Sequence, residues 1–315
     1  MTTLIVSGDL HGKSLFDRLA QPKALLKTDE PFDIDIRIDN SGSKAVLRQD
    51  DVTIDLEEIG NIYIRRPITN NRDSALPPHA RDFINRETQE IIAFLSAYSR
   101  YKKSGFLFCQ GKQFNLGSNK IIQLMAATEL GIRIPETRIT NIPSVAEQFY
   151  EAMNGEIIYK CLSTPVVEYE DGKRSMIHTS PVPNTDFSNV NNCPRLFQKN
   201  IKKATELRIA VVGSQTLAVS IDSQKSNSTR QDWRIGMSNK EMYSLSHLPQ
   251  SVSKDLIHLH HSLGLGWGMT DMIVSHGGEH VFLETNPDGA WLWLEDAIPS
   301  LGITELLARY ISKTK

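Results

Sequence analysis

The chain has 315 residues, enough for two or three packed units, and its 40% hydrophobic and 23% charged residues are typical of a globular protein. Lys and Arg number 35 and Asp and Glu number 37, so the net charge of −2 gives no overall electrostatic basis for binding nucleic acid. No apolar run approaches the roughly 18 residues that span a bilayer, and the first residues lack the basic start and apolar stretch of a signal peptide. Cys109, Cys161 and Cys193 are isolated and odd in number, so we expect reduced thiols in a cytoplasmic protein without a membrane partner.

The first third of the chain alternates short strands with helices. Hydrophobic alternation predicts strands at residues 3–7, 32–38, 45–47, 52–56 and 62–64. Apolar spacing predicts a helix beginning near residue 13 and a long helix over residues 81–102. The polar, Pro-containing segment 70–78 between them is expected to be a loop.

The rest of the chain is predicted to be richer in strands. A helix capped by Ser118 or Asn119 should end at Gly131, since Ser and Asn favour helix starts and Gly favours helix ends. Further helices are expected after Pro143 and over 251–263, and the polar segment 223–230 is expected to be a mobile loop. Strands are predicted at 156–160, around an Asp171-Gly172 turn, at 207–212 and 216–221 around Gly213-Ser214, and at 269–274 and 280–285 around Gly277-Gly278.

The sequence Gly8-Asp9-Leu10-His11-Gly12 after the first strand is similar to the first metal-binding motif of metallophosphoesterases. That chemistry requires further Asp, Asn and His ligands in Gly-Asp-x-x-Asp and Gly-Asn-His motifs, and neither occurs here. The same stretch is one residue short of a P-loop. We therefore interpret it as a strand-to-helix turn that uses glycine.

The predicted hairpin at Gly277-Gly278 brings acidic side chains together. A two-residue turn there pairs Asp271 with Glu284, whose Cβ atoms would lie about 4.5–5.5 Å apart on one face. Asn286 follows two residues after Glu284 and points the same way. Two facing carboxylates repel unless a cation lies between them, and oxygen ligands suit Mg²⁺ that bridges phosphates. The alternative is an ordinary solvated acidic pair.

The segment from Glu284 to Trp291 resembles the metal strand and glycine loop of ATP-grasp ligases. Further fragments resemble that family in the same order along the chain: Asn119-Lys120, residues 134–137, the lysine strand ending at Lys160, the adenine hinge at 196–201, and the strand around Arg208. The nearest resemblance is to the peptide-macrocyclising ligases of microviridin-type (graspetide) biosynthesis, through Arg65-Arg66-Pro67, Asp232-Trp233-Arg234 and residues 291–295. Lys199 occupies a hinge position that is often acidic in relatives. Adenine is usually bound there by backbone groups, so the difference does not change the interpretation.

This resemblance implies an α+β fold of three parts and assigns roles to the residues. Arg208 and Arg234 are the expected catalytic residues, acting on the transferring phosphoryl group and on the acyl phosphate or oxyanion. The plainer alternatives are that Arg208 faces solvent, paired with Glu206, and that Arg234 forms a structural salt bridge. The expected nucleotide-binding residues are Lys120, Lys160, Gln198, Lys199, Ile201 and Glu206, and the expected Mg²⁺ ligands are Asp271, Glu284 and Asn286.

The implied function is ATP-dependent joining of Asp or Glu side chains in a ribosomal precursor peptide, with leader and core, to Ser or Thr hydroxyls or Lys amines. A second hypothesis is addition of an amino acid to a terminal carboxylate, and a third is a non-enzymatic peptide-binding module. The expected parts are an N-terminal domain at 1–115, a central domain at 116–197 and a C-terminal domain at 198–315, with a homodimer allowed. The hairpin around Asp171-Gly172 carries Lys173 and Arg174, and it is either a leader-binding surface or a plain solvated hairpin.

Overall fold

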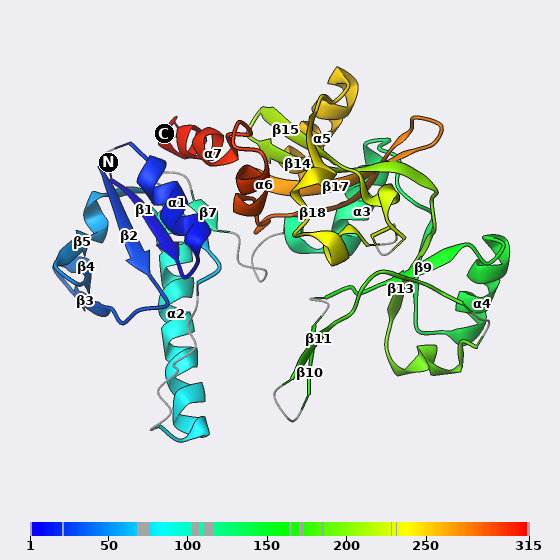
Figure 1. Cartoon of the computed structure of the whole chain (residues 1–315). Helices are drawn as coiled ribbons and strands as arrows, with labels where there is room; N and C mark the ends of the chain where they lie inside the picture. The colour runs from blue at the N-terminus through cyan, green and yellow to red at the C-terminus, as the bar shows by residue number, and fades with distance from the viewer. Residues whose placement is uncertain are drawn as a thin grey trace.

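A computed structural model shows how these elements assemble; it describes residues 2–20, 22–67, 76–102, 107–109, 116–163, 166–169, 173–183, 186–227, 229–230 and 232–313. The described strands form five sheets, and helices and strands are mixed along the chain as predicted. The larger sheets lie in an N-terminal, a central and a C-terminal part (Figure 1). None of the helices in these described ranges has the length and apolar character that a membrane crossing requires.

The N-terminal part is a parallel sheet with helices packed against it. Leu4 and Val6 face a core with Leu95 of the long helix, whereas Ile5 between them faces the opposite side with Leu15, as expected for alternating strand residues. The sheet order is β2-β1-β6-β7, and a small antiparallel sheet β3-β4-β5 closes one side. The elements are β1 (Thr2–Ser7), α1 (Leu10–Arg18), β2 (Lys23–Lys27), β3 (Asp33–Asp39), β4 (Gly42–Gln49), β5 (Val52–Asp55), β6 (Ile59–Arg65), α2 (Pro78–Lys102) and β7 (Leu107–Cys109).

The central part is a small antiparallel sheet in the order β12-β9-β13-β8, from which the hairpin β10-β11 projects (Figure 1). Phe149 of α4 packs with Ile157 and Phe197 to form its own small core. By contrast, Leu124 of α3 packs with Leu256 and Phe282, so α3 belongs to the core of the C-terminal sheet. The elements are α3 (Lys120–Glu129), β8 (Thr137–Thr140), α4 (Pro143–Ala152), β9 (Ile157–Lys160), β10 (Val166–Glu168), β11 (Arg174–Met176), β12 (Ser180–Pro181) and β13 (Arg195–Lys199).

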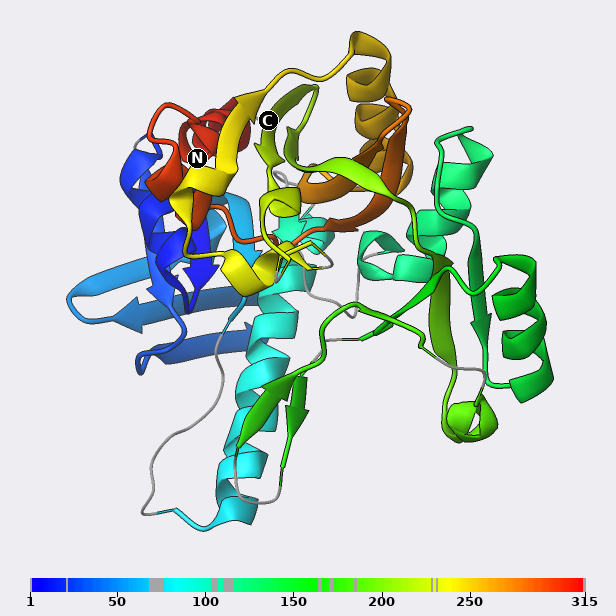
Figure 2. The same cartoon turned by 45° about the vertical axis from the view of Figure 1, so that its right-hand side comes forward.

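The C-terminal part is a five-stranded antiparallel sheet in the order β16-β15-β14-β17-β18. One face packs on α3 and α5, and the other packs on α7, which also contacts α1 of the N-terminal part (Figures 1 and 2). Its elements are β14 (Lys203–Val212), β15 (Gln215–Ile221), the 3-10 turn η5 (Trp233–Gly236), β16 (Tyr243–Ser246), α5 (Gln250–Ser262), β17 (Trp267–Ser275), β18 (His280–Asn286), α6 (Leu292–Ala297) and α7 (Ile303–Lys313).

One core joins the two ends of the chain. Ile5 and Tyr63 of the N-terminal sheet pack in the same cluster as Trp267, Trp291 and Ile311. This shared core fixes the N-terminal part against the C-terminal sheet. The predicted domain boundaries after residues 115 and 197 stay predictions, and β13 continues past the second of them to Lys199.

Several element predictions need correction. The first helix begins at Leu10, not near residue 13, because the Asp9 side chain accepts a hydrogen bond from the backbone N–H of Gly12 and caps it. Gly12 therefore lies inside the helix, where an added Cβ would come within 2.2 Å of Ser7 Cβ. The strands β2, β7, β8, β12, β13 and β16 and the helices α6 and α7 were not predicted as elements.

Two predicted loops and one predicted hairpin turn can be compared with the structure only in part. Most of 70–78 and the Asp171-Gly172 turn lie outside the described residues, although β10 and β11 pair antiparallel as the hairpin prediction requires. The segment 223–230 is anchored in its described part, because Ser223 and Thr229 are buried and the Thr229 hydroxyl donates to the Ser223 carbonyl at 2.8 Å. That nucleotide and peptide protect this segment from protease stays a prediction.

His260 on α5 predicts a loss of stability in mild acid. The ring is 1% exposed, its Nε2 lies 2.9 Å from the Thr270 hydroxyl, and burial lowers its pKa to about 3. Between pH 6.5 and 3 the unfolded chain binds a proton that the folded chain does not, so stability falls as pH falls, by at most about 1.4 kcal/mol per pH unit.

Urea unfolding at pH 7 and pH 5 measures this effect. The stability lost between the two values should be smaller in His260→Gln than in wild type. The exposed neighbour His261 on the same helix provides the control, since His261→Gln should keep the wild-type difference. Equal losses in wild type and His260→Gln would contradict the assignment.

Candidate functional site

The predicted residues converge on one pocket between the central and C-terminal sheets. The pocket contains about 650 Å³ of empty space, part of it open to solvent. Eight of the eleven predicted side chains line it: Lys160, Gln198, Lys199, Ile201, Glu206, Arg234, Asp271 and Glu284. Arg208 and Lys120 contact lining carboxylates, and Asn286 does not line the pocket.

Asp271 and Glu284 lie opposite each other on β17 and β18, as predicted. The predicted two-residue turn is wrong, however, because the hairpin closes with the Ser275 N–H bonded to the Glu279 carbonyl. That closure shifts the pairing of the hairpin by one residue. An irregularity between Asp271 and Met272 shifts it back, so the pairing of the two carboxylates is the predicted one.

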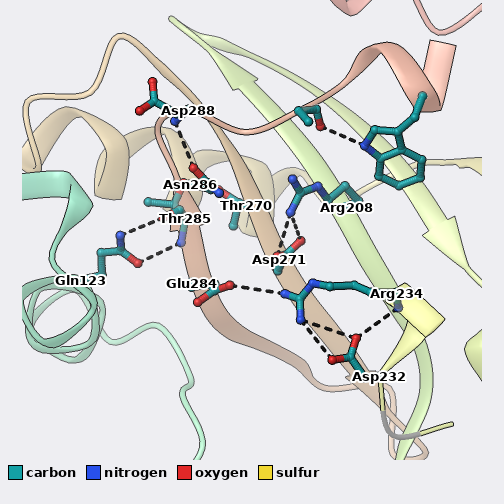
Figure 3. A network of polar contacts seen from close by, with 12 residues as sticks. Gln123, Arg208, Asp232, Arg234, Thr270, Asp271, Glu284, Thr285, Asn286 and Asp288 are labelled. Atoms are coloured by element: carbon teal, nitrogen blue, oxygen red, sulfur yellow. Dashed lines mark hydrogen bonds and ion pairs between the residues drawn. The ribbon is translucent and has the colours of Figure 1, made fainter. Parts of the chain in front are cut away.

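Arg208 supplies the positive charge beside Asp271. It lies on β14 directly across from Asp271, and its Nη1 is 2.7 Å and 2.8 Å from the two carboxylate oxygens. Both residues are more than nine-tenths buried. Figure 3 shows this pair beside Glu284 and Arg234. The ion pair therefore orients Asp271 in the pocket lining.

Glu284 lies among three cationic side chains. Lys120 Nζ is 3.1 Å and Arg234 Nη2 is 3.7 Å from its carboxylate oxygens. Burial alone would raise the pKa of Glu284, but the charges of Lys120, Lys160 and Arg234 together hold the pKa below its usual range. Burial in turn lowers the pKa of Lys160, with Glu284 opposing that shift. Glu284 is thus a carboxylate at neutral pH, ready to bind a cation.

Asn286 lies two residues beyond Glu284 on β18 but does not line the pocket with the two carboxylates. It pairs with Met269, is exposed, and its Oδ1 accepts a hydrogen bond from the Asp288 N–H at 3.0 Å. Across the described ranges, no group of three or more His, Cys, Asp or Glu side chains is arranged to hold a metal ion. Asp271 and Glu284 fit two positions of an oxygen-ligand site, and the role of Asn286 stays a prediction.

Another part of the pocket lining is less charged. Pro135, Ile158 and Ile201 line it together with Gln198 and Lys199. Gln198 is 1% exposed; its Nε2 donates to the Thr137 hydroxyl at 3.0 Å, and its Oε1 has no hydrogen-bond partner in the described structure. A buried acceptor without a partner at an apolar slot suits a ligand ring that carries an N–H donor.

Gln123 is a structural support that the sequence interpretation missed. Its Oε1 accepts from the Thr285 N–H at 2.9 Å, and its Nε2 donates to the Thr285 carbonyl at 2.8 Å (Figure 3). The two bonds attach α3 to β18 at the residue after Glu284. Gln123 follows Lys120 by three positions, so one helix orients both the lysine and the carboxylate strand. The sequence signal that could have identified Gln123 is a polar residue among the apolar residues of this predicted helix.

The segment Gly8 to Gly12 takes a structural role at the N-terminal junction. Asp9 pairs with Nε of the fully buried Arg65 at 3.1 Å, and the Arg65 guanidinium lies 4.7 Å from the Trp291 ring. His11 Nε2 accepts from the backbone N–H groups of Trp291 and Leu292 at 3.2 and 3.4 Å. These contacts hold the loop that follows the Glu284 strand.

The same loop approaches the sheet closely. An added Cβ at Gly289 would lie 2.3 Å from Cγ of Met269, so only glycine fits. Arg66 adopts φ of +39° and donates from Nη2 to the Asp288 carbonyl at 2.7 Å. The Arg65-Arg66 pair thus positions the loop, a role that the motif alone did not reveal.

Cationic side chains outnumber carboxylates in and around the pocket. The pocket lining and the residues that form ion pairs with it include six cations, Lys120, Lys160, Lys199, Lys203, Arg208 and Arg234, and five carboxylates, Glu136, Glu206, Asp232, Asp271 and Glu284. The excess of one positive charge is local, since the whole chain is slightly acidic. The positive charge of this pocket favours binding of a polyanion. A cation bound to that polyanion could contact the carboxylates of Asp271 and Glu284.

No family model matches the sequence, and no curated protein matches it. Solved structures do match the fold. A ligase from Chryseobacterium gregarium, described as a RiPP-associated ATP-grasp ligase in complex with ADP and a leader and core peptide, is 25% identical. The TM-score is 0.86, with 98% of this chain and 96% of that chain covered.

Two further structures extend the comparison. The macrocyclase MdnC of Microcystis aeruginosa MRC, bound with the precursor peptide MdnA, is 27% identical, with a TM-score of 0.85 and 99% of each chain covered. The ATP-grasp ligase PsnB, complexed with Mg, ADP and a variant of its minimal precursor, is 16% identical, with a TM-score of 0.73 and coverage of 99% and 98%. The predicted ATP-grasp fold is confirmed over essentially the whole chain, and the protein is an ATP-grasp ligase that resembles peptide maturases.

Proposed function

We propose that this ligase uses ATP and Mg²⁺ to activate Asp or Glu side chains of a ribosomal precursor peptide and joins them to Ser or Thr hydroxyls or Lys amines. The observation that carries the proposal is the pair Asp271 and Glu284, surrounded by Lys120, Lys160, Arg208 and Arg234 in one pocket. Similar structures hold ADP and a precursor peptide, which supports the same ligand classes here. The homodimer and the cytoplasmic location stay predictions.

The residues suggest a division of the pocket along its length. Gln198, Lys199 and Ile201 would hold the base, and Lys120 and Lys160 would neutralise the phosphates that approach Glu284. Mg²⁺ held by Asp271 and Glu284, with Asn286 as the third predicted ligand, would compensate phosphate charge during transfer to the peptide carboxylate. Arg208 pairs with Asp271, and Arg234, which lies next to Glu284, would contact the acyl phosphate.

Activation explains the need for ATP. A carboxylate is a poor electrophile, whereas an acyl phosphate reacts with a hydroxyl or amine and releases phosphate. Proximity then favours ring closure, because both reacting groups belong to one bound peptide.

Mass spectrometry tests the proposal. Incubation with ATP, Mg²⁺ and a candidate precursor peptide should lower the peptide mass by one water for each ring. The alternative reaction, addition of an amino acid to a terminal carboxylate, would raise the mass instead. An unchanged peptide, together with ATP-dependent product from a free amino acid, would contradict macrocyclisation and support that alternative.

The hairpin β10-β11 carries a prediction about the leader. Arg174 pairs with Glu168 across the hairpin at 3.1 Å, and both are exposed. If the hairpin reads charge on the leader, Lys173→Glu with Arg174→Glu should weaken binding of a labelled leader peptide about tenfold or more, as expected for two reversed charges at an interface. ATP affinity should be unchanged. Glu147→Lys on the exposed face of α4 is the control, and equal leader affinity in all three proteins would exclude the hairpin.

A further inference from the structure

A histidine and a buried aspartate meet at the edge of the pocket. His178 follows β11 in the segment that leads to β12, and its Nδ1 lies 3.2 Å from Oδ2 of Asp232. Asp232 is 4% exposed and caps η5 by accepting from the Arg234 N–H at 3.1 Å. The two residues come from segments more than fifty positions apart, so the contact depends on the tertiary fold.

The pair has a defined direction of proton donation. Burial would raise the pKa of Asp232, but the charge and backbone N–H of Arg234 and the hydrogen bond with His178 together lower it. Asp232 is therefore an ionised carboxylate and can only accept, so the proton of a neutral His178 ring lies on Nδ1. Nε2 then carries the lone pair, and within the described part of the chain it has no hydrogen-bond partner.

The position of the pair is next to the reacting end of the pocket. Thr179, Asp232 and Arg234 all line the pocket, and Arg234 connects Asp232 to Glu284 with distances of 3.3 Å and 3.7 Å. Figure 3 shows Arg234 between these two carboxylates. The His178 side chain is 38% exposed, so a bound peptide can reach it.

Other groups near the pocket are less suited to accept a proton. Asp271 is paired with Arg208, and Glu284 with Lys120, and both are the expected ligands of Mg²⁺. His11 accepts hydrogen bonds from the loop at Trp291, and His260 is buried on the far side of β17 against Thr270. Among the histidines of the described ranges, His178 alone is oriented by a carboxylate that also lines the pocket.

We propose that His178 is the general base of the coupling step, with Asp232 as its positioning residue. This role rests on the proposed function. As the acceptor hydroxyl oxygen attacks the acyl carbon, His178 Nε2 takes its proton, and the carbon–oxygen bond to phosphate breaks with its electron pair leaving on phosphate. An ester and inorganic phosphate result, and Asp232 stabilises the imidazolium that forms.

Hydroxylamine separates activation from coupling. It is uncharged at neutral pH and captures an acyl phosphate as a hydroxamate without assistance from a base. With precursor peptide, ATP and Mg²⁺, His178→Gln should form peptide hydroxamate at a rate within about threefold of wild type. Ring formation without hydroxylamine should fall by about 10²- to 10⁴-fold, the range for removal of a general base.

Two further variants sharpen the test. His178→Ala should regain part of its ring formation when imidazole is added, whereas His276→Gln, an exposed histidine at the β17-β18 turn, should behave as wild type. Wild-type ring formation by His178→Gln would overturn the role, as would equal losses of hydroxamate and rings. If wild type forms neither rings nor hydroxamate, the proposed function fails, and the role of His178 fails with it.

Discussion

Replacement of Glu284 by Gln should abolish ligation while leaving the fold intact. The amide keeps the size of the side chain but removes the negative charge that Lys120, Lys160 and Arg234 surround. A neutral amide binds the Mg²⁺ at the nucleotide phosphates more weakly than a carboxylate does. We therefore expect the rate of ring formation to fall by at least about 10²-fold.

The fold should tolerate Glu284→Gln because the surrounding cations retain other partners. Lys120 Nζ donates to the Cys161 carbonyl at 2.9 Å, and Arg234 remains paired with Asp232. Urea unfolding should therefore show a change in stability below about 2 kcal/mol. Glu279→Gln on the same hairpin is the matched control, since Glu279 is half-exposed and pairs with Arg133. Turnover of Glu284→Gln at the wild-type rate would remove Glu284 from the site.

The sequence predicted which side chains gather at the pocket better than it predicted the contacts that support them. Opposed carboxylates on a hairpin follow from strand alternation, and the structure places Asp271 opposite Glu284. The prediction reached this pairing through a wrong turn, because a register irregularity after Asp271 is not visible in residue types. Alternation alone would thus have failed if the irregularity lay two residues earlier.

Long-range contacts account for most of what was missed. Gln123 binds the backbone of Thr285, His178 binds Asp232, and Asp9 binds Arg65. Each contact joins segments more than fifty residues apart, and no local pattern states which segments meet. The segment Gly8 to Gly12 illustrates the problem, since its Asp and His resemble metal ligands in sequence but hold an arginine and a loop in the fold.

Arg208 is expected to affect both stability and catalysis, and a pair of variants separates the two effects. Its guanidinium contacts both oxygens of Asp271, and both side chains are buried. Arg208→Met leaves the Asp271 carboxylate buried without its partner, which should lower the free energy of unfolding by about 3–5 kcal/mol. Ring formation should fall by about 10²-fold or more, because Asp271 is no longer fixed and a phosphate-facing charge is lost.

Adding Asp271→Leu to Arg208→Met removes the unpaired charge and replaces the pair by apolar side chains. Because a buried ion pair replaced as a whole often costs little, the double variant should regain most of the lost stability. It should remain inactive, since the carboxylate that faces Glu284 is gone. Urea unfolding and mass spectrometry of the peptide product measure the two properties on the same samples. Recovery of activity together with stability would show that Arg208 and Asp271 only support the fold, and it would move the cation site away from Asp271.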